Sequence, residues 1–170
     1  LIRDLARMPT VVGMKCHEPL YGFYNYARST RDDGFAVLGA GLMRQFLFDA
    51  WHLEMLAALE KSSDPRVAEI AAKAKKEVAY HVERSADLVI RLGDGTAESH
   101  DRMQTALDDI WPYTGEMFLS DMADKAMAAA GIAPDPETLR AKWDAVVAEV
   151  LAEATLKHPE GSFAHKGGKT

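Results

Sequence analysis

The sequence predicts an all-α protein built as an up-down bundle of long helices. Apolar residues recur at helical spacing over long stretches, short turns with capping signals join these stretches, and no segment alternates like a pair of strands. Short turns between long helices make consecutive helices antiparallel neighbours. The chain has 170 residues, 48% of them hydrophobic. We therefore expect one helical domain over residues 1–158 with its own core, followed by a flexible tail over residues 159–170.

Composition and charge argue against several classes of function. The formal net charge of −6 disfavours a broad contact with nucleic acid or an anionic membrane. No apolar run approaches the ~20 residues that span a bilayer. The single cysteine, Cys16, excludes an intrachain disulfide framework and is interpreted as a small hydrophobe rather than a nucleophile. We expect a cytoplasmic protein without a nucleic-acid or membrane partner.

The first forty residues show no clean helical or strand period, and we expect them to be irregular or truncated. Because the chain begins at Leu1 without a methionine, residues upstream of it are expected in the complete protein. Residues 20–26 are unusually aromatic and form either a partner surface or an irregular segment over the core. The residues of this cluster are Leu20, Tyr21, Phe23, Tyr24 and Tyr26.

Two long helices are predicted in the first half of the chain after residue 34. The first covers 35–61 and carries a core-facing stripe. Its members are Leu38, Leu42, Phe46, Leu53 and Leu56. Asp64 is a good N-cap and Pro65 suits a first helical turn, so a second helix follows over 65–92. Gly93-Asp94-Gly95 should end this second helix.

Two more helices are predicted in the second half. One starts near Thr96 or Ser99, which are both competent caps, and continues to about residue 130, where Gly131 ends it. Pro112 lies inside this helix and should kink it near Trp111, because proline removes a helical hydrogen bond. The loop Pro134-Asp135-Pro136 then restarts the chain, and a last helix covers 136–156.

Some residues of the bundle resemble part of a metal site. Ferritin-like bundles bind two metal ions with one Glu from each of two helices and a Glu-x-x-His pair from each of two others. The three-residue spacing places both ligands on one helical face. Asp49 and His52 have this spacing. His81 does not, since Val78 stands three residues before it and Glu77 stands four before.

We therefore predict no catalytic, cofactor-binding or metal residue, and interpret Asp49, His52, Glu77 and His81 as a vestigial set. In this interpretation they form a buried polar network in which carboxylates orient imidazoles. His81 is expected to be buried, on an inward face shared with neighbours at helical spacing. These neighbours are Val67, Ile70, Ala74 and Leu88. The alternative is a working metal site built from Asp49, Glu77 and His81.

Two further patterns have ordinary explanations. The basic run Lys73, Lys75 and Lys76 is interpreted as a solvated helix face. Four methionines are interpreted as core or interface fillers. They are Met103, Met117, Met122 and Met127.

Specific motifs over about two-thirds of the chain carry a family resemblance. They include Arg44-Gln45-Phe46-Leu47-Phe48-Asp49-Ala50-Trp51-His52, Ser63-Asp64-Pro65, Lys76-Glu77-x-x-Tyr80-His81, Arg91-Leu92-Gly93-Asp94-Gly95-Thr96, Arg102-Met103-Gln104, Glu116-Met117-Phe118 and Glu153-Ala154-Thr155-Leu156. With these motifs the chain resembles the C subunits of bacterial phenylacetyl-CoA epoxidases, in the phenylacetic acid catabolic protein family. Residues 1–41 do not align with that family.

The resemblance implies a multicomponent enzyme that epoxidises the aromatic ring of phenylacetyl-CoA with oxygen and NADPH-derived electrons. A related A subunit holds the di-iron centre in such enzymes, and the ferritin-like C subunit pairs with it after losing metal ligands. We accordingly expect a structural, non-catalytic subunit without its own cofactor, docked on a catalytic A-type subunit, with a homodimer as a further possibility. The alternative is a stand-alone di-iron oxygenase or oxidase that uses Asp49, Glu77 and His81.

Overall fold

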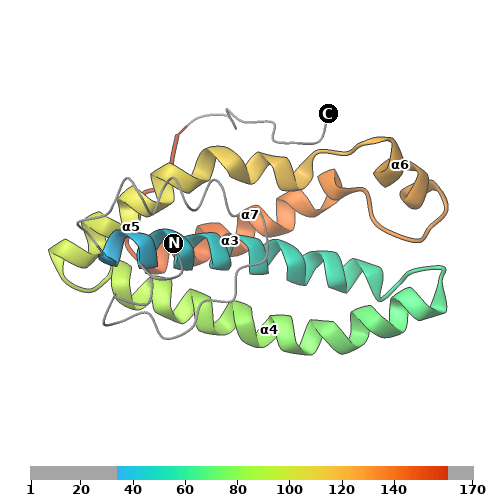
Figure 1. Ribbon diagram of the computed structural model, residues 1–170, viewed down its shortest axis with the longest axis horizontal. Coiled ribbons are helices and arrows are strands. Elements are labelled where there is room, and N and C mark those ends of the chain that lie inside the picture. Colours follow the sequence, from blue (N-terminus) through green and yellow to red (C-terminus); the bar gives the residue numbers. More distant parts are fainter. Residues whose placement is uncertain (1–33, 161–170) are drawn as a thin grey trace, which may run out of the picture.

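The computed structural model describes residues 34–160, and these residues form an all-α bundle without a strand. Long helices run side by side along the long axis of the molecule (Figure 1). The all-α bundle prediction is confirmed, whereas the predictions for Cys16 and residues 20–26 lie outside the described residues. The elements in chain order are α3 (Gly34–Leu59), α4 (Pro65–Gly93), α5 (Ala97–Ile110), the 3-10 helix η1 (Trp111–Phe118), α6 (Met122–Ala129), the 3-10 helix η2 (Pro136–Leu139) and α7 (Arg140–Glu153).

Helix α3 lies at the centre of the bundle and contacts α4, α5, η2 and α7. Because neighbours surround it on several sides, it buries far more than a single stripe, and Met43, Phe46 and Leu47 are almost completely shielded from solvent. Of the predicted stripe, Phe46 and Leu56 are buried and Leu42 and Leu53 are half-buried. The helix covers Gly34–Leu59 and confirms the helix predicted over 35–61 to within two residues, so the irregular stretch expected over the first forty residues does not extend into 34–40.

Helix α4 begins as its sequence predicts. The Asp64 carboxylate accepts hydrogen bonds from the backbone N–H groups of Arg66 and Val67, and Pro65 occupies the first turn. Lys75 forms an ion pair with Glu60 across the α3–α4 turn, while Lys73 and Lys76 are exposed, as expected for a solvated face.

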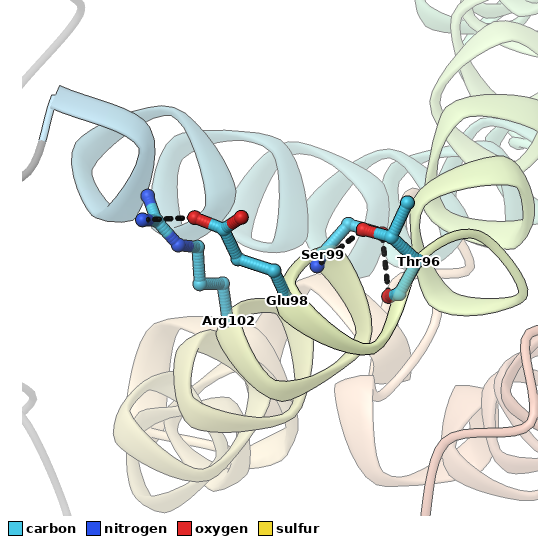
Figure 2. Close-up of polar contacts among 4 residues, drawn as sticks. All are labelled: Thr96, Glu98, Ser99 and Arg102. Atoms are coloured by element: carbon cyan, nitrogen blue, oxygen red, sulfur yellow. Dashed lines mark hydrogen bonds and ion pairs between the residues drawn. The ribbon is translucent and has the colours of Figure 1, made fainter.

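The turn after α4 leads directly into the cap of α5 (Figure 2). Thr96 is the N-cap, and its Oγ1 accepts the backbone N–H of Ser99 at 3.2 Å. Ser99 lies inside the helix and donates its hydroxyl to the Thr96 carbonyl at 3.0 Å. One turn further on, Arg102 donates to Glu98 at 2.7 Å. Thr96 rather than Ser99 is therefore the cap of this helix.

The single kinked helix predicted over 96–130 is wrong, because the chain divides into three pieces there. Helix α5 ends at Ile110, η1 follows, and α6 starts afresh at Asp121 with a capping box to Asp124. Pro112 at the start of η1 has no N–H to continue the α-helical ladder. Trp111 and Phe118, the first and last residues of η1, are both buried in the core.

The predicted ends of the last two helices are confirmed in part. Gly131 ends α6 with a φ of +69°, the left-handed conformation typical of a residue just past a helix. Helix α7 stops at Glu153, before the predicted end at residue 156, because Thr155 takes a φ of +58°. The chain then turns back, so that Leu156 is buried and its N–H donates to the Leu151 carbonyl.

The residues after α7 are fastened to α5. The Gln104 side chain donates to the Lys157 carbonyl at 3.0 Å and accepts the Lys157 N–H at 2.8 Å. The His158 ring lies edge-on against Trp111 at 4.4 Å between ring centroids. None of the helices in the described range is long and apolar enough to cross a membrane.

Trp143 of α7 joins the two halves of the main core. Its side chain is fully buried and its ring packs against Trp111 and Phe118, at centroid distances of 5.6 and 5.2 Å. Its indole Nε1–H donates to the backbone carbonyl of Leu47 on α3 at 2.9 Å. One side chain therefore fastens α7 and η1 to the central helix.

We predict that Trp143→Phe lowers the free energy of unfolding by roughly 1–3 kcal/mol, since it removes a buried hydrogen bond and leaves a small cavity. Trp51→Phe is the matched control, because the buried Nε1–H of Trp51 has no hydrogen-bond partner among the described residues. Chemical denaturation should show a loss below about 1 kcal/mol for this control. Equal losses in the two variants would contradict the role given to the Trp143 hydrogen bond.

A second prediction concerns Gly93, where α4 meets the end of α7. A Cβ atom on Gly93 would lie 2.5 Å from the Ala154 carbonyl oxygen and 2.8 Å from the Ala154 Cβ. Gly93→Ala should therefore cost about 1–3 kcal/mol of stability. Gly39→Ala, inside α3, meets only ordinary contacts at 3.6 Å and beyond and should stabilise the fold by roughly 0.5–1 kcal/mol. Thermal denaturation of the pair would reveal the opposite signs.

Candidate functional site: a buried carboxylate beside two histidines

Asp49 of α3 is the most buried acidic residue of the described chain, with 2% of its surface exposed. The Gln45 side chain, one turn earlier, donates to its Oδ1 at 2.7 Å. Its Oδ2 is buried and has no hydrogen-bond partner in the described range. Burial raises the pKa of the Asp49 carboxyl above its ordinary value, although the Gln45 hydrogen bond and nearby positive groups act in the opposite direction.

Two histidines lie close enough to Asp49 to act on it electrostatically. His52 is half-buried on α3, three residues after Asp49, and His81 reaches the same place from α4. Burial lowers the pKa of His52, and the positive charge of His81 adds to this effect, while the Asp49 carboxylate opposes it. The cluster thus favours an uncharged carboxyl and an uncharged imidazole.

Aromatic rings lie near this cluster on both α3 and α4. The Phe48 ring lies 5.6 Å from that of Trp51 and 5.5 Å from that of His52, and the Tyr80 and His81 rings lie 6.3 Å apart. The Arg44 guanidinium sits over the Phe48 ring, 5.7 Å from its centroid. We call these rings the aromatic band. It consists of Phe48, Trp51, His52, Tyr80 and His81.

The structure corrects the predicted inward face of α4. His81 is exposed, and Ile70 of the same predicted stripe is 65% exposed. The buried residues of α4 lie on a stripe rotated by about one position. They are Ala71, Val78, Ser85, Val89 and Gly93. The sequence pattern misplaced the buried stripe of α4 because alanines and other apolar residues lie on both sides of it. Which of these residues are buried is therefore decided by the packing of α3 against α4.

The position that a metal ligand would need is part of the apolar core. Val78 is only 6% exposed and packs with Leu56 and Ala71 in a small second cluster between α3 and α4. Glu77 is exposed and is not among the groups that shift the pKa of Asp49 or His52. Between residues 34 and 160, no three His, Cys, Asp or Glu side chains are grouped so that they could hold a metal ion. The described residues therefore do not form a di-iron ligand set.

Of the four residues named from sequence, the structure brings Asp49, His52 and His81 together and leaves Glu77 outside. Gln45 and Arg44 were missed. Gln45 could have been found, because a glutamine four residues before an aspartate lies beside it on a helix. The aromatic band could not, since Tyr80 and His81 join Phe48 and His52 only through the packing of α4 on α3.

These features define the class of protein, a helical bundle with a buried carboxyl between histidines of two adjacent helices. The family model described as phenylacetic acid catabolic protein matches residues 29–170, so the expectation that residues 1–41 do not align with this family was wrong for residues 29–41. The chain is 44% identical over 128 residues to the C subunit of 1,2-phenylacetyl-CoA epoxidase of Escherichia coli (strain K12). This match covers 75% of the chain and 52% of the relative, so the chain spans about half of that relative's length.

The chain thus belongs to the phenylacetic acid catabolic protein family, and the resemblance seen in its motifs is confirmed.

We predict that Asp49→Asn stabilises the fold at neutral and higher pH. A folded-state pKa raised by burial means that stability is full below the unfolded value of about 3.9 and is lost as pH rises through the folded pKa. The Asn variant lacks this loss, so its melting temperature should exceed that of the wild type at pH 8, with the difference shrinking towards pH 4. Asp108→Asn is the control, because exposed Asp108 makes the same kind of Gln hydrogen bond, from Gln104 at 3.0 Å. A constant difference from pH 4 to pH 8 would contradict the prediction.

Proposed function

We propose that this chain acts in phenylacetate catabolism as a structural, non-catalytic subunit of a phenylacetyl-CoA epoxidase, docked on a catalytic A-type di-iron homologue. The similarity to a named C subunit supports the assignment to this enzyme. The observation that carries the non-catalytic role is Val78, an apolar core residue at the position where a Glu-x-x-His pair would supply its carboxylate.

The residues left at the former site suit a structural task. Asp49 accepts a hydrogen bond from Gln45 and acts electrostatically on His52 of α3 and His81 of α4. The stand-alone di-iron oxygenase would require Glu77 and His81 to turn inward, whereas both are exposed.

The experiment is a measurement of iron in the isolated chain and in a complex with an A-type subunit of the same family. We expect co-expression to give a stable complex that contains about two iron ions, and the isolated chain to contain essentially none after anaerobic addition of ferrous iron. His81→Ala should leave the iron content of the complex unchanged. About two iron ions in the isolated chain, lost in His81→Ala, would instead establish the stand-alone di-iron enzyme.

A further inference from the structure

Residues 119–135, which join η1 to η2 and contain α6, include no buried residue. Phe118 before this segment and Pro136 after it are both buried. Met122, at the start of α6, is 88% exposed. In Figure 1, α6 lies at the end of the molecule where α3 turns into α4. The segment thus adds nothing to either core cluster, although buried residues flank it on both sides.

The two ends of this segment are held together. The Ser120 hydroxyl donates a hydrogen bond to the Asp135 carboxylate. Asp135 is also the N-cap of η2, where it accepts the backbone N–H of Glu137 at 3.1 Å. Because the ends are joined to each other in this way, the segment between them has no need to pull η1 or η2 out of the core when it opens.

Ser63, in the turn between α3 and α4, holds the far end of the segment. Its backbone N–H donates to the Gly131 carbonyl at 2.8 Å, and its hydroxyl donates to the Ala130 carbonyl at 3.0 Å. We call these two hydrogen bonds the Ser63 latch. Both carbonyls lie at the C-terminal end of α6, where a helix leaves carbonyls without intrahelical partners. The latch therefore supplies donors to the end of α6 from another part of the bundle.

Helix α6 is too short to be stable by itself. It has eight residues, and a helix of this length is marginal in water because few hydrogen bonds offset the cost of nucleation. The capping box between Asp121 and Asp124 stabilises its first turn, and the Ser63 latch stabilises its other end. Since no residue of α6 is buried, the helix depends on the interactions at its two ends.

We propose that residues 119–135 form a flap that unfolds and refolds while the bundle stays folded, and that the Ser63 latch sets how often it opens. When the latch breaks, α6 loses support at its C-terminal end and unwinds, because neither core cluster holds it. Opening exposes no core residue, so its free energy is far smaller than that of global unfolding. This behaviour belongs to the chain itself and does not rest on the proposed function.

Amide hydrogen exchange of the full chain tests the flap. The amides of residues 125–132 should exchange at least ~100-fold faster than those in the middle of α3, with little dependence on denaturant concentration, because opening exposes little surface. Ser63→Ala should speed their exchange roughly 5-fold, the effect of one lost hydrogen bond. Ser62→Ala is the matched control, because the Ser62 hydroxyl accepts the Asp64 N–H within the α3–α4 turn. It should change this exchange by less than ~2-fold.

A disulfide gives a second test, because it locks the latch. A Cβ atom on Gly131 would lie 3.7 Å from the Ser63 Cβ, within the range of disulfides. In the variant Ser63→Cys/Gly131→Cys, made with Cys16→Ser, oxidation should slow exchange of residues 125–132 at least ~10-fold relative to the reduced form. The strain of a cysteine at the φ of +69° is the same in both forms and cancels.

Two results would overturn the proposal. Exchange of residues 125–132 with the rate and denaturant dependence of the α3 core would show that the segment opens only when the whole bundle unfolds. Exchange that neither Ser63→Ala nor the disulfide changes would show that Ser63 does not hold the flap.

Discussion

The hydrogen bond from the Trp143 indole to the Leu47 carbonyl joins the last helix to the central one, and most of the core is arranged around it. A buried indole N–H without an acceptor would cost a few kcal/mol, so α7 has to approach α3 at this height and orientation. Trp111 and Phe118 then complete the packing around the ring. Both of these residues belong to η1, the 3-10 segment that contains Pro112.

Helix α4 is packed differently at its two ends, because α7 contacts it at one end only. Near Gly93 it meets the turn after α7, where Ala154 comes too close for any side chain on the glycine. Towards the α3–α4 turn, α7 no longer covers the pair, and Val78 and Leu56 close a small core of their own. Helix α4 thus changes from a bundle helix at one end to half of a two-helix hairpin at the other.

Asp49 lies near the boundary between these two regions. Its burial would be unfavourable for a carboxylate without strong partners, and its raised pKa reflects that cost. In a bundle with a full ligand set, a metal ion would compensate such a buried carboxylate. Here Val78 is part of an apolar cluster between α3 and α4, and aromatic rings lie near Asp49 on both helices. The result is a core that is more apolar than a metal centre and a flank that is rich in exposed rings.

The sequence by itself determined the all-α class and the absence of a Glu-x-x-His pair at His81. It also determined where α4 starts, at its Asp64 cap, where α4 ends, near Gly93, and where α6 ends, at Gly131. Local backbone chemistry decides these features, so nearby residues are sufficient to predict them. Only the tertiary structure decided that residues 111–118 form 3-10 turns, because Pro112 predicts a break in the helical hydrogen bonds but not the backbone geometry that follows it. It also decided that His81 is exposed, since the apolar residues of α4 allow stripes one position apart and the packing of α3 selects between them.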